Sequence, residues 1–161
     1  MSSKAKPIPD GYHSLTPNLT CQNTPRAIDW LKQVFGAVEI MRMPDPTGRI
    51  VHAELRIGDS VLMLHEEMPE CGQLSPLALK GNGSSTFVYL EDVDATFAKA
   101  IAAGAKASSP PTDMFWGDRM AGFTDPFGHS WGIATHVLDM TPEAMQQGAE
   151  KFFKEMAAAK S

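Results

Sequence analysis

Residues 48–67 read GRIVHAELRIGDSVLMLHEE, and this stretch decides the fold. Apolar and polar residues alternate on both sides of Gly58-Asp59, which is typical of two antiparallel strands joined by a two-residue type II′ turn. The turn sets the register: Ile57 faces Ser60, Arg56 faces Val61, and the antiparallel pairing continues in this way along both strands. The stretch therefore predicts a β-hairpin.

The two faces of this hairpin differ in chemistry. One face is apolar and consists of Ala53, Leu55, Ile57, Leu62 and Leu64. The other face mixes ionisable and apolar side chains, namely His52, Glu54, Arg56, Val61, Met63 and His65. Other parts of the chain must cover the apolar face, and we expect the mixed face to line a ligand pocket.

Composition excludes several classes of partner. The chain has 161 residues, with 14 Lys and Arg against 19 Asp and Glu, and its net charge is −5. No basic run interrupts this balance, so we expect neither nucleic acid nor a membrane surface as a partner. No segment approaches the ~20 apolar residues that span a bilayer, and no secretion signal is recognisable, so we expect a cytoplasmic location. Cys21 and Cys71 should be reduced thiols.

The elements before the hairpin form a short series. Alternation over residues 13–21 predicts a strand. A capping residue followed by Pro25, with helical spacing up to Gly36, predicts a helix. A second strand is expected over residues 38–43, so the order up to the hairpin's end is strand, helix, strand, strand, strand.

The second half of the chain repeats this order. A strand followed by a helix is predicted after a Pro-, Gly- and Ser-rich linker, and Gly104-Ala105 ends that helix as Gly36-Ala37 ends the first. Gly104 comes 68 residues after Gly36. The same offset of 68 residues places Pro126-Phe127, in a second turn, at the position of Gly58-Asp59. Duplicated units usually pack on each other to complete a core. We therefore predict an α+β fold of two βαβββ modules, with the first module over residues 12–68, the linker over 69–83, the second module over 84–138 and a C-terminal helix over 141–160.

The second hairpin is predicted around the turn at residues 125–128. A four-residue turn pairs Thr124 with His129, and we interpret Arg119 and Phe123 as facing inward with the mixed face of the first hairpin. Both residues are therefore expected in the pocket.

Several of these features together resemble a known family. They are the two βαβββ units, the helices ending in Gly-Ala, the stretch HAELRIGDSVLML at residues 52–64 and the closing GDRMAGFTDPFGHSW at residues 117–131. The chain resembles the vicinal oxygen chelate superfamily, which includes glyoxalase, bleomycin resistance proteins and extradiol dioxygenases, and is most similar to its PhnB-like branch. The resemblance covers residues 12–138 and implies two modules whose sheets curl round a shared cavity, commonly in a homodimer.

The resemblance also implies where a metal would bind. Metal-dependent members place ligands on the first and last strands of each module, and those positions correspond here to Thr16, Met63, Thr86 and Gly132. None of them is His, Asp or Glu, and Met63 and Gly132 cannot supply the nitrogen or carboxylate donors that a divalent ion needs. No cofactor and no metal ligand is therefore predicted, and a divalent ion at a displaced site is the disfavoured alternative.

The mixed face supplies the candidates for acid–base chemistry, which are His52, Glu54 and His65. The alternative is that these side chains only bond one another and make the pocket polar. The expected ligand-binding residues lie on the cavity faces or in the loop before Arg119, and they are Thr16, Asn18, Arg56, Met63, Trp116, Arg119 and Phe123. His136 is interpreted as a surface or dimer-contact residue.

Two functions remain open at this point. In the first, a cytoplasmic homodimer binds a small organic molecule in a mixed polar and apolar cavity without a metal, and either sequesters it or acts on it by acid–base catalysis. In the second, the protein is a metal-dependent lyase or dioxygenase of glyoxalase type. A purely structural partner protein would instead have its cavity filled by side chains.

Overall fold

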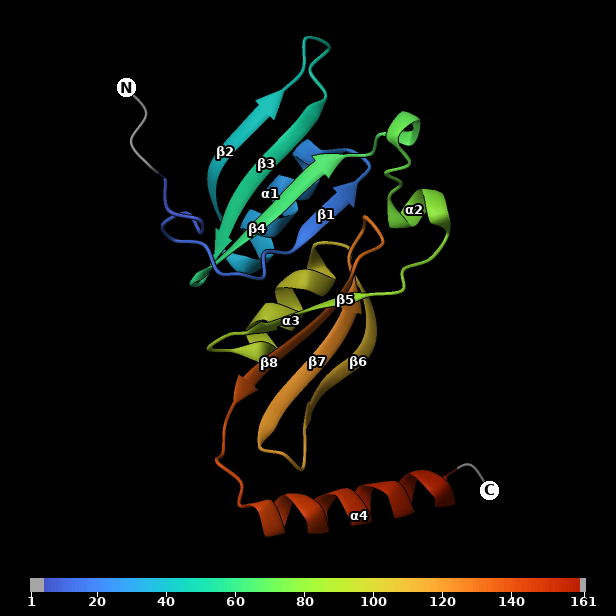
Figure 1. Ribbon diagram of the computed structural model, residues 1–161. Coiled ribbons are helices and arrows are strands. Elements are labelled where there is room, and N and C mark those ends of the chain that lie inside the picture. The colour runs from blue at the N-terminus through green and yellow to red at the C-terminus, as the bar shows by residue number, and fades with distance from the viewer. Residues whose placement is uncertain (1–4, 160–161) are drawn as a thin grey trace.

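Each half of the chain forms one four-stranded sheet with a helix against it (Figure 1). The computed structural model describes residues 5–159. The first half contains β1 (Asn18–Cys21), α1 (Thr24–Phe35), β2 (Val38–Pro44), β3 (Ile50–Ile57) and β4 (Ser60–Glu66). The second half contains β5 (Ser85–Tyr89), α3 (Val93–Ala102), β6 (Lys106–Asp113), β7 (Asp118–Thr124) and β8 (Ser130–His136). Two short helices, η1 (Pro69–Cys71) and α2 (Pro76–Leu79), lie between the halves. The C-terminal helix α4 (Pro142–Ala158) follows β8.

The predicted α+β fold with two βαβββ modules and a C-terminal helix is confirmed. The sheets have the matching strand orders β1-β4-β3-β2 and β5-β8-β7-β6. In each sheet the first strand pairs in parallel with the last one, and the other pairs are antiparallel. A parallel pair requires a crossover connection, and α1 and α3 are part of those connections.

The helix α1 forms where local chemistry favours it. The Asn23 side chain accepts a hydrogen bond from the backbone N–H of Arg26, and Pro25 occupies the first turn. The carboxylate of Glu66, at the end of β4, accepts hydrogen bonds from the backbone N–H groups of Asn23 and Thr24, both at 2.7 Å. These contacts satisfy N–H groups that have no partner inside a helix, and they tie the start of α1 to the sheet.

The helix-covered faces of the two sheets share one core. The ring of Trp30 on α1 lies 6.1 Å from that of Phe123 on β7, and the ring of Phe35 lies 4.9 Å from that of Trp131 on β8. The indole N–H of Trp30 also donates to the carbonyl oxygen of Ala103, just after α3, at 3.1 Å. Each module therefore buries apolar surface of the other, as expected of a duplicated unit.

The second hairpin differs from the predicted register. The Asp125 carboxylate accepts hydrogen bonds from the backbone N–H groups of Phe127 and His129, each at 2.9 Å, and the Asp125 N–H bonds the His129 carbonyl oxygen. These bonds include His129 in the turn, so Thr124 pairs with Ser130. The predicted pairing of Thr124 with His129 is wrong by one residue.

This register corrects two predicted pocket residues. Phe123 lies opposite Trp131 on the helix-covered face, and only 1% of its surface is exposed. Arg119 points to the same face, where its guanidinium bonds Asp94 of α3 at 2.6 and 2.8 Å and Asp113 of β6 at 2.9 Å. Both predictions were wrong, because the alternation along β7 places these two residues on the side that packs against α3.

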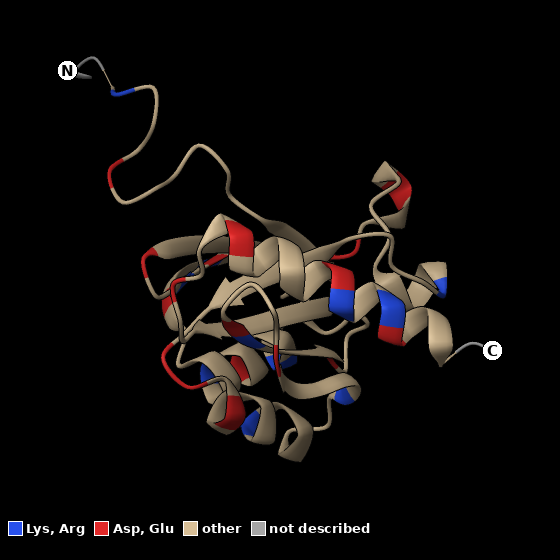
Figure 2. Cartoon of the chain, turned by 90° about the horizontal axis from the view of Figure 1, so that it is seen from below, with Lys and Arg blue, Asp and Glu red and all other residues tan. Residues whose placement is uncertain are grey.

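The C-terminal helix α4 lies across the end of the second sheet (Figure 1). Its Phe152 packs against Phe115 with ring centroids 5.7 Å apart, and Gly148 lets Phe115 approach closely. Figure 2 shows acidic and basic residues interspersed along the helix. In the part of the chain that the structure describes, no helix is long and apolar enough to span a membrane.

Candidate functional site

The face of each sheet opposite its helix is named here the open face. On the first sheet, the structure pairs Ala53 with Leu64 and Glu54 with Met63, and continues in step to Ile57 with Ser60. The predicted register of the first hairpin is therefore confirmed over these pairs. Ala53 and Leu64 are fully buried on the helix side, whereas Glu54 and Met63 are only partly buried.

Glu54 is the centre of a hydrogen-bonded cluster on this open face. The hydroxyl of Tyr12 donates to its Oε2 atom, and Nε2 of His52 lies 2.9 Å from its Oε1 atom. The hydrogen bond from Tyr12, followed by that from His52, holds the pKa of Glu54 below its usual value. The same contact raises the pKa of Tyr12. Glu54 is thus an ionised acceptor between two donors.

A cavity borders this cluster. Its volume is about 360 Å³, within the range of roughly 300–1,000 Å³ that is usual for small-ligand sites. Glu54 and Met63 line it from the sheet, and Tyr12 and Thr16 line it from the segment before β1. Pro7, Ile8, Pro9, His13 and Ser14 complete the lining. The wall therefore combines a carboxylate, hydroxyls and apolar surface.

Other predicted site residues lie outside this cavity. His65 is 6% exposed, and its ring nitrogens lie 2.9 Å from the carbonyl oxygen of Glu66 and 3.3 Å from the hydroxyl of Thr20. Asn18 lines a separate cavity of about 180 Å³ together with Thr20. Arg56 is exposed on the same strand as Glu54. The structure thus brings His52 and Glu54 together, of which only Glu54 lines the cavity, and leaves His65 apart from them.

The open face of the second sheet carries a comparable cluster, which the sequence did not reveal. Asp118 is 3% exposed and accepts hydrogen bonds from the Tyr89 hydroxyl at 2.9 Å, the Trp116 indole N–H at 3.1 Å and Nδ1 of His136 at 2.7 Å. Burial opposes the ionisation of Asp118, but the hydrogen bonds outweigh it and lower its pKa. The predicted ligand-binding residue Trp116 is therefore a partner of this carboxylate. Correct strand parity on β7 would have indicated the cluster.

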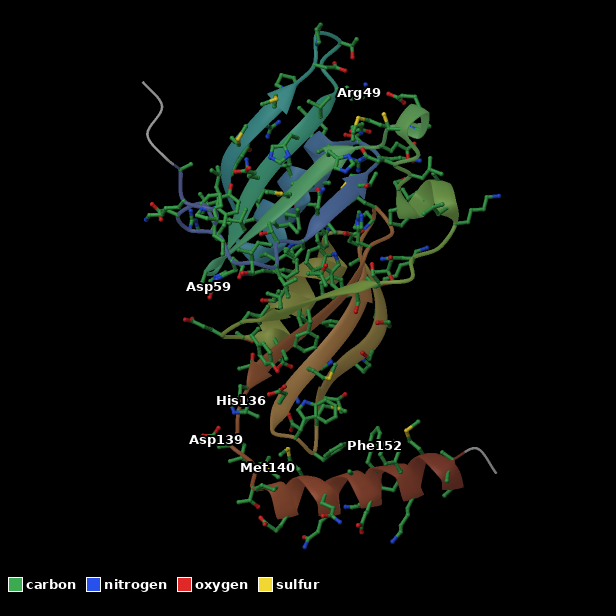
Figure 3. The ribbon with its side chains drawn as sticks, in the orientation of Figure 1. Arg49, Asp59, His136, Asp139, Met140 and Phe152 are labelled. Atoms are coloured by element: carbon green, nitrogen blue, oxygen red, sulfur yellow. The ribbon has the colours of Figure 1, made fainter. Side chains whose placement is uncertain are left out.

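A wider cavity of about 720 Å³ lies between the β3–β4 turn and β5. Its lining is largely apolar and includes Phe35, Val61, Phe87 and Trp131. Asp59 lies at the tip of the turn on its rim (Figure 3), and its side chain is 88% exposed. Among the described residues that line it there is no histidine.

The residues at the expected metal positions do not fit a divalent ion. Met63 pairs with Asn18 of β1, and Gly132 pairs with Phe87 of β5. The ring of Phe87 covers Gly132 so closely that an added Cβ would lie 2.6 Å from a ring carbon. None of the four expected metal ligands, Thr16, Met63, Thr86 and Gly132, offers an imidazole or a carboxylate. Within residues 5–159 there is also no group of three or more His, Cys, Asp or Glu side chains that could hold a metal ion.

Comparison with known proteins identifies the family. A model of the Glyoxalase/Bleomycin resistance protein/Dioxygenase superfamily matches residues 13–133. The chain belongs to this superfamily. The uncharacterized protein Rv0887c of Mycobacterium tuberculosis is 36% identical over 136 residues, which are 83% of this chain and 80% of the relative. The helix α4 lies beyond the residues that the family model matches.

Solved structures agree with this assignment. TioX from Micromonospora sp. ML1 has 31% identity and a TM-score of 0.59, over 76% of this chain and 98% of its own. The fosfomycin resistance protein FosX from Mesorhizobium loti has 16% identity and a TM-score of 0.57, over 78% of this chain and 92% of its own. The likeness to FosX shows the fold alone.

Proposed function

We propose that this protein binds a small organic molecule on the open face of its first sheet, without a resident metal ion. The observation that supports the proposal is the Tyr12–Glu54–His52 cluster beside the cavity of about 360 Å³. The lining combines the Glu54 carboxylate and hydroxyl groups with Met63 and two prolines, which favours a ligand that has both a polar and an apolar part. The PhnB-like branch remains a prediction.

The cluster suits either sequestration or proton transfer. Both oxygens of Glu54 accept hydrogen bonds, so its charge fixes the orientation of its partners. When Nε2 of His52 donates to Glu54, Nδ1 keeps a lone pair, and it has no hydrogen-bond partner among the described residues. In the catalytic form of the proposal, a ligand that extends from the cavity to His52 gives a proton to Nδ1, and Glu54 stabilises the resulting imidazolium. In the sequestering form, the same atom only accepts a hydrogen bond.

A metal-dependent lyase or dioxygenase is the weaker alternative. It would need carboxylate or imidazole donors at the expected metal positions, Thr16, Met63, Thr86 and Gly132, and these side chains have none. The donor set, rather than any missing ion, is the reason that we favour metal-free binding.

We also propose that the protein is a cytoplasmic homodimer. Large apolar side chains are exposed on the open faces, among them Val38, Met43, Phe87 and Tyr89, and a second copy covering them would enclose the cavities further. Cys21 and Cys71 are free thiols, which suits a reducing compartment. Light scattering after gel filtration tests the dimer: a mass near twice 17.5 kDa supports it and a mass near 17.5 kDa contradicts it.

The ligand proposal is tested by ligand-observed NMR with a library of small aromatic, thiol and carboxylate compounds. Compounds that bind the wild type are then titrated into Glu54→Gln. We expect their affinity to fall about tenfold, because the ligand would lose a hydrogen bond to the charged carboxylate of Glu54. A hydrogen bond to a charged group contributes ~1.5 kcal/mol or more.

A matched control is available for this titration. Glu70 bonds Arg49 at 2.8 Å on the exposed surface and does not line the cavity, so Glu70→Gln removes a charge of the same kind elsewhere. The affinity of Glu70→Gln for the compounds should equal that of the wild type. If Glu54→Gln also binds like the wild type, the ligand lies elsewhere and the proposal fails.

A further inference from the structure

The cluster around Asp118 on the second sheet has no part in the proposed function. Its three donors come from separate elements: Tyr89 from β5, Trp116 from the turn before β7, and His136 from the end of β8. The Asp118 side chain is itself 4% exposed. A buried carboxylate with three donors is held in one position, and it fixes the imidazole of His136 in turn.

This arrangement determines which way His136 points. Nδ1 donates to Asp118, so Nε2 is turned away from that carboxylate. Nε2 lies 3.0 Å from the Oδ1 atom of Asp139, in the segment that leads from β8 to α4. Figure 3 shows His136 and Asp139 side by side there. The side chain of His136 is 51% exposed, so Nε2 can be reached from solvent.

The contact with Asp139 is an exposed one. The Asp139 side chain is fully exposed and makes no other hydrogen bond within the part of the chain that the structure describes. The nearby backbone is held independently, because the N–H groups of Val137 and Leu138 both donate to the carbonyl oxygen of Gly117. Asp139 can therefore leave Nε2 without releasing α4.

Both ring nitrogens of His136 face carboxylates. Hydrogen bonds to Asp139, then Asp118, raise the pKa of His136, which favours the doubly protonated ring that donates at Nε2. Tyr89 is the third titratable group at this point, and its hydroxyl donates to Asp118. The structure itself shows that a carboxylate is accepted at Nε2.

An aromatic surface lies on the same sheet face as His136, because Tyr89 pairs with Ala134, two residues before His136 on β8. Tyr89 bonds Asp118 through its hydroxyl, while its ring is 5.2 Å from the ring of Phe87. The two residues are 63% and 47% exposed. Exposed rings of this kind favour contact with a flat apolar group.

We propose that His136 binds the carboxylate of a small aromatic acid, and that Asp139 occupies this position when the acid is absent. Exposed ion pairs contribute little to stability, so breaking the pair between His136 and Asp139 costs little. Contact of the ligand ring with Tyr89 and Phe87 then favours the ligand. No covalent bond is made or broken. The inference does not depend on the cavity beside Glu54.

Benzoate titrated into the full chain tests this inference, with the imidazole NMR signals of His136 as the readout. In the wild type, benzoate should shift these signals in a saturable way, and uncharged benzamide should not. Asp139→Asn should bind benzoate about two- to fivefold more tightly, which is the effect of removing a competing exposed ion pair. Benzoate binding, followed by ligand-observed NMR, should be lost in His136→Gln.

The matched control is Asp10→Asn. Asp10 is also an exposed aspartate in an exposed ion pair, with Lys6 at 2.6 Å, and its variant should bind benzoate like the wild type. Equal benzoate affinity in the wild type and Asp139→Asn would overturn the proposal. Retained binding in His136→Gln, or equal binding of benzamide, would overturn it as well. Because the readout is His136, a negative result leaves the proposal for Glu54 unaffected.

Discussion

The open faces of the two modules carry the same three kinds of side chain in different surroundings. On the first sheet the cluster is Tyr12, Glu54 and His52, and on the second sheet it is Tyr89, Asp118 and His136. In the first cluster the tyrosine comes from a segment outside the sheet, and a cavity remains beside it. In the second, the tyrosine comes from the sheet and Trp116 adds a third donor. The first arrangement suits a ligand of some size, and the second holds one imidazole in place.

The segments that flank the two clusters are also held differently. Residues 7–16 reach the first sheet mainly through side chains, of which Tyr12 is the one bonded to Glu54. Residues 137 and 138 reach the second sheet through the backbone, at Gly117. A backbone contact tolerates less change than a side-chain contact, so mutations should distinguish the two modules.

The largest loss of stability is expected for Gly117→Ala. Gly117 has φ +96°, and an added Cβ would lie 1.9 Å from the carbonyl oxygen of Leu138. We expect a loss of about 3 kcal/mol in unfolding free energy, from backbone strain and displacement of the segment before α4. Urea denaturation measures this value.

Gly72→Ala is the matched control for backbone strain alone. Gly72 has φ +74° and open space around its Cβ position, so its variant should lose only about 1 kcal/mol. Equal losses in the two variants would show that the contact between Gly117 and Leu138 does not hold the segment.

A smaller difference in unfolding free energy is expected between substitutions of the two carboxylates. Asp118→Asn weakens hydrogen bonds from three donors to a buried group and should lower the unfolding free energy by about 2 kcal/mol. Glu54→Gln acts on a partly exposed group with two donors and should cost about 1 kcal/mol or less. Urea titrations at pH 7 compare the two, and a larger loss for Glu54→Gln would reverse the distinction between the clusters.

The pH dependence of stability should also differ between the modules. The pKa of His136 is raised in the folded protein, so its stabilising contribution is complete below the unfolded value of about 6.5 and is lost as the pH rises through the folded pKa. His136→Gln should remove this loss above about pH 6.5. Unfolding curves at several pH values measure it. A wild-type profile retained in His136→Gln would assign the titration to another group.

The smallest effect is expected for Tyr12→Phe. It removes the hydrogen bond that contributes most to the lowered pKa of Glu54, so that pKa should rise toward its usual value. The stability change should stay within about 1 kcal/mol. Carboxyl carbon NMR of Glu54 follows the titration, and an unmoved pKa would mean that Tyr12 does not control this carboxylate.

The first hairpin could be predicted because its turn has only two residues and leaves one register. The second could not, because the Asp125 side chain binds the backbone of Phe127 and His129 and lengthens the turn. Side-chain bonds to turn backbone do not show in apolar periodicity. The 68-residue offset between the repeats aligns Ala53 and Leu55, on the helix-covered face of the first sheet, with Ala121 and Phe123 of β7. This alignment already indicated that Phe123 faces the helix.

The clusters were predictable only in part. His52 and Glu54 were identified because they share one face of a well-defined hairpin. Tyr12 was not, because it lies in a segment without periodicity and its partner is far away in the sequence. His136 lies opposite Asp118 in the second hairpin, so the error in that register hid the cluster in which Tyr89 and His136 both bond Asp118.

One crystal structure tests the central claim most directly: that the open faces bind organic groups instead of a metal ion. Crystals would be grown with zinc and with the compound that binds most tightly in the NMR screen, and anomalous data collected at the zinc edge. We predict density for the compound against Glu54 and Met63, with no zinc peak between Met63 and Gly132. A zinc ion held there, with the compound bound to it, would contradict the account.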